Sequence, residues 1–251
     1  MKGVILAGGE NTRLRPTTKV VSKNLLLAYN KPVIYYPILA LKGIGIKEVL
    51  IISSPQHLGQ IINVVGSGRD FDLKFTYEIQ EEPKGLSHGL LIAEDFADND
   101  KIVYILGDNI FDNIKFLKKA KDDFEKQERG AKIALAEVPN PERFGVPKFN
   151  KKGDKIIEIV EKPKKSWTNW IIPGFYLLDN RAFEFAKKVK PSARGEYEIT
   201  DLLDFYAKEG SLTFQRVKGF WRDVGTFDTL LEASVFMAKK ARKQQKLQKS
   251  K

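Results

Sequence analysis

The chain has 251 residues, of which 42% are hydrophobic and 30% are charged, a composition typical of a folded domain that excludes extended disorder. It contains no cysteine, which excludes disulfides, zinc ribbons and thiol catalysis, and its two histidines are too few for a histidine-rich metal site. The net charge is +11, and residues 239–251, which hold seven lysines and arginines and no acid, account for more than half of it.

Apolar runs rich in β-branched and aromatic residues recur along the chain and predict strands. Between the early runs lie segments with helical spacing, at 33–45, 86–97 and 114–127. This alternation predicts an α/β fold with a mostly parallel, Rossmann-like sheet that carries helices on both faces. Proline and glycine clusters in the second half predict added antiparallel strands on one side. The expected strands are 3–8, 48–54, 73–79, 102–108, 131–138, 156–162, 171–178 and 212–217.

The two ends of the chain bear on location and partners. The N-terminus runs directly into an apolar segment without a basic leader, and no apolar stretch approaches the length of a membrane span. We therefore expect a cytoplasmic protein without a membrane partner. We interpret residues 239–251 as a solvated helix end, whose cations favour the negative pole of the helix dipole. An arm that binds nucleic acid is the less favoured alternative.

The chain opens with an apolar run that stops at paired glycines, in "KGVILAGGENTRLRP". Ligands of open α/β sheets bind beyond the carboxyl ends of the strands, so Gly8 and Gly9 are expected where a phosphate-bearing molecule would bind. Glycine lets backbone N–H groups approach an anion closely, and Arg13 and Arg15 add positive charge. The third glycine of the dinucleotide fingerprint is missing and no Gly-Lys-Ser/Thr follows, so neither phosphate motif is present.

Residues 6–38, "LAGGENTRLRPTTKVVSKNLLLAYNKPVIYYPI", resemble the signature of the sugar-phosphate nucleotidyltransferases, and within them most of all the glucose-1-phosphate thymidylyltransferases. The resemblance runs from residue 1 to 238. It implies a nucleotide-diphospho-sugar transferase fold, with a single nucleotidyltransferase domain at 1–238 followed by the basic C-terminal tail at 239–251. Further matches follow in the same order, namely "QEEPKGLSHGLLIAEDF", "LGDNIF", "PERFGVPKF", "EKPKK", "PGFYLLD", "RGEYEITD" and "WRDVGTFDTLLEAS".

The resemblance also implies a reaction, in which a sugar 1-phosphate oxygen attacks the α-phosphorus of a nucleoside triphosphate and pyrophosphate leaves. Because the nucleophile is already ionised, catalysis reduces to holding two polyanions in line and neutralising their repulsion. The implied substrates are dTTP or UTP and a hexose 1-phosphate, with glucose 1-phosphate favoured, and the products are a nucleotide sugar and pyrophosphate. The family usually forms homo-oligomers, which leaves a homo-oligomer open here.

Four charged residues would carry the phosphate chemistry. By resemblance Arg13 and Lys23 stabilise charge on the triphosphate and the departing pyrophosphate, and with Asp108 they make up the catalytic set. Asp108 follows an almost wholly apolar strand, so we expect its carboxylate at the same sheet edge as the glycine loop. Asp108 and Asp223 are the implied ligands of Mg²⁺, which prefers oxygen donors. For Asp108 alone, a helix cap is the alternative.

The remaining substrate contacts follow from the resemblance as well. A side-chain amide suits thymine or uracil, which offers carbonyl acceptors around an N–H donor. Glu161 would accept from sugar hydroxyls and Lys162 and Arg194 would neutralise the sugar phosphate, whereas Trp221 is either an apolar wall or a core aromatic. The implied nucleotide contacts are Leu6, Gly8, Gly9, Asn11, Thr12, Asn24, Gln80 and Gly85, and the implied sugar-phosphate contacts are Gly145, Glu161, Lys162, Arg194 and Trp221.

Several positions depart from the family pattern. Asn11 replaces the third glycine of the loop, and Asn24 stands in place of the usual glutamine and is one methylene shorter. Arg222 replaces an apolar residue next to the predicted metal ligand, where it would weaken Mg²⁺ binding or engage a phosphate. His88 stands where the family usually has glutamine near the nucleotide. The departures at Asn11, Asn24 and Arg222 motivate an alternative function, a non-catalytic regulatory protein that binds a nucleotide or nucleotide sugar.

Overall fold

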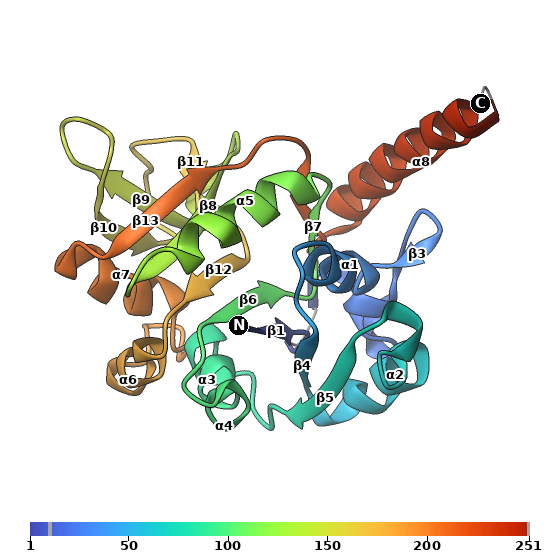
Figure 1. Ribbon diagram of the computed structural model, residues 1–251, viewed down its shortest axis with the longest axis horizontal. Coiled ribbons are helices and arrows are strands. Elements are labelled where there is room, and N and C mark those ends of the chain that lie inside the picture. Colours follow the sequence, from blue (N-terminus) through green and yellow to red (C-terminus); the bar gives the residue numbers. More distant parts are fainter. Residues whose placement is uncertain (10–11, 250–251) are drawn as a thin grey trace.

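A twisted central sheet of eight strands organises the protein (Figure 1). The computed structural model describes residues 1–9 and 12–249. The strand order is β11-β8-β12-β6-β1-β4-β5, and β13 pairs with β8. The bounds are β1 (Lys2–Leu6), β4 (Glu48–Ser53), β5 (Lys74–Ile79), β6 (Ile102–Leu106), β8 (Ala131–Glu137), β11 (Trp170–Ile171), β12 (Phe175–Leu178) and β13 (Leu212–Arg216).

The four strands β6, β1, β4 and β5 run parallel to one another and form the half of the sheet that starts the chain. Val4 and Ile5, at the centre of β1, have no exposed surface, because helices cover both faces. A strand buried on both faces reads as a continuous apolar run, which explains why these strands are visible in the sequence. β12 pairs antiparallel with both β6 and β8. The predicted mostly parallel sheet is confirmed.

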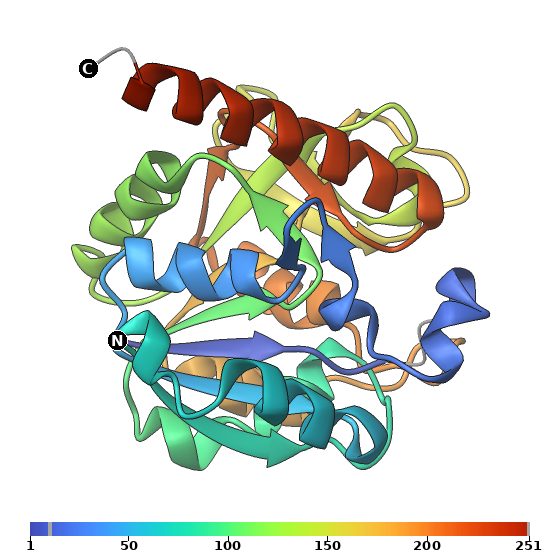
Figure 2. The ribbon, with the colours of Figure 1, turned by 90° about the vertical axis from the view of Figure 1, so that its right-hand side faces the viewer.

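Helices lie on both faces of the sheet (Figure 2), and a hydrophobic core fills the space on each face, as the predicted architecture requires. Helices α1 (Tyr35–Gly43), α2 (Pro55–Val65) and α5 (Ile114–Glu125) supply side chains such as Ile38, Ile61 and Phe116 to one core. The other core receives side chains from α3 (Leu86–Leu91), α4 (Glu94–Ala97), α6 (Arg181–Lys188) and α7 (Ile199–Glu209).

Short antiparallel pairs stand outside the main sheet, and the hairpin in the second half of the chain is the one that the sequence predicts. The hairpin of β9 (Gly145–Phe149) and β10 (Ile156–Glu161) stands beside the sheet, and β7 (Asn109–Phe111) pairs with β14 (Trp221–Asp223). The β7–β14 pair matters for function, because it brings a segment near the end of the chain next to the residues that follow β6. A further small pair joins β2 (Leu27–Ala28) to β3 (Lys31–Pro32).

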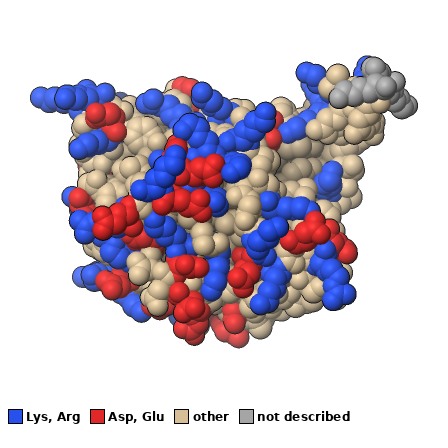
Figure 3. All heavy atoms as spheres, in the orientation of Figure 1, with Lys and Arg blue, Asp and Glu red and all other residues tan. Residues whose placement is uncertain are grey.

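The chain closes with one long helix, α8 (Phe227–Lys249), which projects from the body of the protein (Figures 1 and 2). The boundary expected at residue 238 falls inside this continuous helix, and Lys240 donates a hydrogen bond to the Asp112 carbonyl at 2.8 Å. Basic and acidic side chains are interspersed on the face of the protein in Figure 3. Across the described part of the chain, every helix is too short or too polar to span a bilayer.

Candidate active site

The carboxyl ends of the parallel strands meet at one edge of the sheet. Gly8 and Gly9 follow β1 closely, Asp108 follows β6, and Gln80 follows β5 directly. Backbone hydrogen bonds continue past the strand ends, from Gly107 N to Leu6 O at 2.8 Å and from Gln80 N to Ser53 O at 2.8 Å. The glycine loop, a carboxylate and an amide therefore share an edge, where open α/β sheets bind their ligands.

The glycine loop is tight and closely approached by its neighbours. Gly9 has φ of 108°, a left-handed conformation that favours glycine. A Cβ on Gly8 would lie 3.0 Å from the Gln80 side-chain oxygen, so glycine leaves that space open. Leu6 is 8% exposed and belongs to the core, whereas Thr12 is exposed at the start of a 3-10 helix, Thr12–Leu14. Asn11 lies outside the described residues.

Asp108 and Asp223, far apart in sequence, lie in one cluster. Asp223 is the register partner of Asn109 in the β7–β14 pair, and the next residue, Val224, donates its N–H to the Asp108 carbonyl at 2.8 Å. Burial and then the negative charge of Asp108 raise the pKa of Asp223, although Arg13 and other cations oppose the shift. The charge of Asp108 therefore acts on the carboxyl group of Asp223. Two carboxylates that interact in this way are the arrangement expected of a divalent-cation site.

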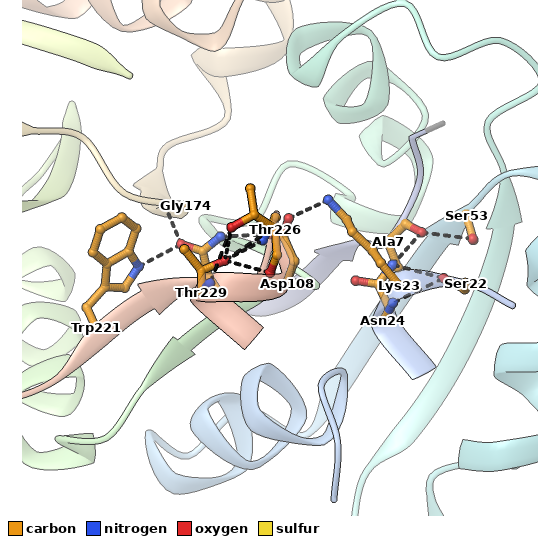
Figure 4. A network of polar contacts seen from close by, with 12 residues as sticks. Ala7, Ser22, Lys23, Asn24, Ser53, Asp108, Gly174, Trp221, Thr226 and Thr229 are labelled. Atoms are coloured by element: carbon orange, nitrogen blue, oxygen red, sulfur yellow. Dashed lines mark hydrogen bonds and ion pairs between the residues drawn. The ribbon is translucent and has the colours of Figure 1, made fainter. Parts of the chain in front are cut away.

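Lys23 pairs with Asp108 across this cluster (Figure 4). The Lys23 Nζ lies 2.5 Å from Asp108 Oδ2, and Asn109 Nδ2 donates to Asp108 Oδ1 at 2.8 Å. Burial alone would raise the pKa of Asp108, but the charge of Lys23 and these hydrogen bonds outweigh it and lower the pKa. Lys23 sits in a 3-10 helix, Lys23–Leu25, capped by Ser22. The carboxylate of Asp108 is therefore held ionised.

Arg13 reaches the same cluster from the segment that follows the glycine loop. A Cβ built on Gly225 would lie 2.8 Å from Arg13 Nη2 and 3.2 Å from Asp223 Oδ2, so the two side chains meet over that glycine. Arg143 also lowers the pKa of Asp223 through its charge. Sequence reasoning quoted "PERFG" as a family match but missed Arg143 as a site residue. Three cations from three separate segments therefore act on the carboxylate pair.

Gln80 and Gly85 form an amide cluster at the end of β5. The Gln80 side chain is 4% exposed, and its Nε2 lies 3.3 Å from the Gly85 carbonyl and 3.1 Å from His88 Nδ1. Gly85 has φ of 99°, and a Cβ there would lie 2.7 Å from the Tyr197 carbonyl. Glycine is required at this turn, and the backbone of Gly85 is thereby fixed beside the amide of Gln80.

Asn24 is buried against the backbone that leads into the glycine loop. It has no exposed surface, and its Nδ2 donates to the Ala7 carbonyl at 2.9 Å and to Ser22 Oγ at 3.2 Å (Figure 4). A Cβ on Gly107 would lie 2.9 Å from its Oδ1. The amide nitrogen of Asn24 therefore binds the backbone before the glycine loop, whereas its Oδ1 has no hydrogen-bond partner among the described residues. The nucleotide contact expected of Asn24 stays a prediction.

A second charged cluster forms where the β9–β10 hairpin meets the start of α7. Arg194 Nη2 lies 2.7 Å from Glu198 Oε1 and 3.4 Å from Glu161 Oε1, and Lys162 Nζ lies 3.4 Å from Glu161 Oε1. Thr200 Oγ1 donates to Glu161 Oε2 at 3.2 Å. Burial, more than any charge, raises the pKa of Glu161. The predicted sugar-phosphate residues Glu161, Lys162 and Arg194 are thus brought together.

Gly145 lines this second cluster, and Thr200 and Ile172, which sequence reasoning missed, contact its members. A Cβ on Gly145 would lie 2.4 Å from Thr200 and 3.3 Å from Glu161 Oε2, so the backbone is closely enclosed. Ile172 donates its N–H to the Gly145 carbonyl at 2.9 Å. Tyr176 lies on β12, and its pKa is raised by burial and then by the charges of Glu161 and Asp108. Tyr176 is buried in the core beneath the sheet edge, where the charges of one carboxylate from each cluster reach it.

Trp221 and Arg222 are both engaged by neighbouring protein groups. Trp221 is 7% exposed, its Nε1 donates to Asn109 Oδ1 at 2.7 Å, and its ring packs edge-on against Phe144. The ring therefore packs as a core aromatic, which favours the core alternative, and an apolar wall for the sugar stays a prediction. Arg222 Nη2 pairs with Glu232 of α8 at 2.6 Å. Part of its guanidinium is therefore directed to α8, whereas its Nε has no hydrogen-bond partner among the described residues.

Replacing Trp221 with phenylalanine should separate the core role from substrate binding. The variant loses the hydrogen bond to Asn109 and part of the packed ring, so we expect the free energy of unfolding in urea to fall by about 1–3 kcal/mol. The KM for the sugar phosphate should not change, because the ring has little surface to offer a ligand. A large increase in that KM at unchanged stability would contradict the core assignment.

The donor set at Asp108 and Asp223 fits Mg²⁺. Mg²⁺ binds oxygen, keeps several waters and commonly uses one or two carboxylates together with substrate phosphates. Within residues 1–9 and 12–249, no group of three or more histidines, aspartates and glutamates is placed to hold a metal by protein ligands alone. A two-carboxylate site that is completed by a phosphate ligand agrees with both facts.

Comparisons with known proteins agree with this geometry. The sequence profile of the nucleotidyl transferase family matches residues 2–240. Glucose-1-phosphate thymidylyltransferases from Neisseria meningitidis and Mycolicibacterium smegmatis are 45% and 41% identical to the chain, in each case over 94% of the chain and 82% of the relative. These values confirm the resemblance drawn from the sequence motifs.

Solved structures agree in fold. A protein from Bacillus anthracis assigned as a glucose-1-phosphate thymidylyltransferase, solved with bound sucrose, is 43% identical with a TM-score of 0.89 over 94% of each chain. A UDP-glucose pyrophosphorylase solved with UDP-glucose is 28% identical, with a TM-score of 0.84 over 95% of this chain and 98% of the other. The chain therefore belongs to the nucleotidyl transferase family and is an enzyme of nucleotidyl transfer.

Proposed function

We propose that the protein transfers a nucleotidyl group from dTTP or UTP to a hexose 1-phosphate, with glucose 1-phosphate favoured, giving a nucleotide sugar and pyrophosphate. The observation that carries the proposal is the meeting of Asp108, Asp223, Arg13 and Lys23 beside the glycine loop. The names of the relatives, thymidylyltransferases and a UDP-glucose pyrophosphorylase, support the choice of substrates.

The triphosphate would lie over Gly8 and Gly9, whose backbone N–H groups can approach phosphate oxygens. Arg13 and Lys23 would neutralise the triphosphate and the pyrophosphate that leaves, since each already faces the carboxylate cluster. Mg²⁺ bound by Asp108 and Asp223 would supply further neutralisation of phosphate charge. Without these cations, the triphosphate and the sugar phosphate would repel each other.

The sugar 1-phosphate would bind at the second cluster. Lys162 and Arg194 carry the charges that its phosphate requires, and Glu161 can accept hydrogen bonds from sugar hydroxyls. Lys162 has φ of 43°, an uncommon left-handed conformation for a residue other than glycine, at the end of β10. Since the attacking phosphate oxygen is already ionised, the site needs no general base, and in-line positioning is the main task of these residues.

The test is an assay of pyrophosphate release by the purified protein with Mg²⁺, dTTP or UTP, and glucose 1-phosphate. We expect release that requires both substrates and the metal. Absence of release across a matrix of nucleoside triphosphates and sugar 1-phosphates would remove the proposal. Tight binding of nucleotide without turnover would instead select the regulatory binding protein, the alternative suggested by the departures in sequence.

The pH dependence of sugar binding offers a second test. Burial raises the pKa of Glu161, and Glu198 adds to the shift while Lys162 opposes it, so Glu161 takes up a proton at a higher pH than an ordinary glutamate. A protonated carboxyl accepts fewer hydrogen bonds, so the KM for glucose 1-phosphate should rise as the pH is lowered. Glu161→Gln should raise this KM by about tenfold at pH 8 and flatten its pH dependence.

A matched control for this test is available on the same strand. Glu158 also lies on β10, but its Oε2 pairs with Lys148 Nζ at 3.0 Å on the surface. This ion pair involves no residue of the second cluster. Glu158→Gln should keep both the KM and its pH dependence. If Glu161→Gln and Glu158→Gln behaved alike, Glu161 would have no part in binding the sugar phosphate.

A further inference from the structure

His88 contacts the side chain that we assign to the nucleobase. Its Nδ1 lies 3.1 Å from Gln80 Nε2, and the same amide nitrogen lies 3.3 Å from the Gly85 carbonyl. His88 is half-buried on α3, and its ring lies beside that of Tyr197, with centroids 6.4 Å apart. The reaction proposed above assigns no role to His88.

The Gly85 carbonyl determines how the Gln80 amide must point. A carbonyl can only accept a hydrogen bond, so the amide atom beside it must be the NH₂ group. His88 Nδ1 faces the same NH₂ group and must therefore accept too, which requires a neutral imidazole with its proton on Nε2. The Gln80 oxygen then points the other way, to within 3.0 Å of where a Cβ on Gly8 would lie.

We propose that neutral His88 is a positioning residue: with the Gly85 carbonyl it holds the Gln80 amide so that its oxygen faces the glycine loop and selects a nucleobase with an N–H donor, uracil or thymine, over cytosine. This inference rests on the proposed function, because it takes the base to lie at Gln80. Uracil and thymine carry a proton on N3, which can donate to this oxygen. Cytosine has a lone pair at N3, which would face the oxygen acceptor to acceptor.

We call this fixed orientation of the Gln80 amide the lock, and protonation of His88 would release it. A proton on Nδ1 would place two donors face to face, and turning the amide over would instead place its oxygen against the Gly85 carbonyl. Either outcome removes the arrangement that faces the loop. Discrimination between thymine and cytosine should therefore weaken when His88 becomes charged.

The surroundings of His88 set the pH at which this happens. Burial, and then the positive charge of Lys84, lower the pKa of His88, while Glu82 acts in the opposite direction. Both charged residues come from the turn that joins Gln80 to α3, and Tyr197 faces the ring from the segment before α7. The imidazole is therefore neutral at pH 7, and the lock is lost only as the pH falls below the usual value for histidine.

The first test reads the tautomer directly and needs no activity. The chain has two histidines, so the ring signals in a long-range ¹H–¹⁵N spectrum can be assigned with His88→Gln and His57→Gln. At pH 8 we expect His88 to carry its proton on Nε2 and to have a bare Nδ1. A proton on Nδ1 at pH 8 would overturn the proposal, because the Gln80 amide could not then be held in this orientation.

The second test measures discrimination. The ratio of kcat/KM for dTTP to that for dCTP should fall about tenfold in the wild-type enzyme between pH 8.5 and pH 5. His88→Gln should make this ratio independent of pH, and His88→Asn serves as a second variant if the first folds poorly. His57→Gln, on α2, should keep the wild-type pH dependence.

These outcomes separate the lock from the proposed function. If the ratio changes with pH equally in wild type and His88→Gln, the lock is refuted even though the enzyme works. If no nucleotide is turned over, the proposed function fails, while the tautomer spectrum still decides whether His88 holds Gln80.

Discussion

Replacing Arg13 with alanine should lower kcat/KM for the nucleoside triphosphate about a thousandfold. The guanidinium faces Asp223 over Gly225, where it can neutralise charge that develops on the phosphates. It lies on an exposed segment with little packing to lose, so the melting temperature should change by no more than about 2 °C. Steady-state kinetics and a thermal melt of the same preparation measure both effects.

Arg15 offers a matched control, because it is exposed, equally charged and two residues further along the same segment. Arg15→Ala should keep most of the activity. If Arg13→Ala lost stability as severely as activity, Arg13 would be a structural arginine. If Arg13→Ala and Arg15→Ala lost activity to the same modest extent, a diffuse field of positive charge would account for the site better than a placed guanidinium.

Replacing Asp108 with asparagine should have a comparable or larger effect, with loss of pyrophosphate release by at least about a thousandfold. The substitution removes one of two carboxylates from the proposed metal site and the ion-pair partner of Lys23. It also removes the charge of Asp108 that, after burial, raises the pKa of Asp223. The pKa of Asp223 should therefore move down in the variant, which carboxyl NMR signals can follow.

The Mg²⁺ dependence of the residual activity identifies the cause. Asp108→Asn should need far more Mg²⁺ for half-maximal rate than wild type, since one ligand is lost. Asp122→Asn, an exposed residue on α5 paired with Lys118, should behave as wild type. Full activity of Asp108→Asn at ordinary Mg²⁺ concentrations would show that this carboxylate does not take part.

The sequence predicts the fold where burial leaves a simple pattern. β1 and β6 are buried on both faces and read as continuous apolar runs, so their positions and the shared edge of Gly8 and Asp108 follow directly. α2 was missed, because its segment begins with Pro55 and contains Gly59, which weaken a helical reading even though its Ile61 is fully buried. Whether such a segment forms a helix depends on its tertiary packing.

The family motifs predict which residues belong to the functional site, but they do not predict how those residues are arranged in space. The family motifs name Asp108 and Asp223, but the three-residue pairing of β7 with β14 that brings them together has too few residues to leave a periodic signal. The sequence also could not predict the directions in which individual side chains point. Asn24 turns beneath the loop and Arg222 towards Glu232 because of the backbone and charges that meet them in space. Single-residue roles depend on such contacts.

The central claim is that Asp108 and Asp223 together hold a divalent cation beside the glycine loop. Anomalous scattering from Mn²⁺, in crystals grown with dTTP and without sugar phosphate, tests it most directly. We predict a single strong peak in contact with both carboxylates and with phosphate oxygens of the nucleotide. A peak bound by the triphosphate alone, or by neither aspartate, would contradict the account.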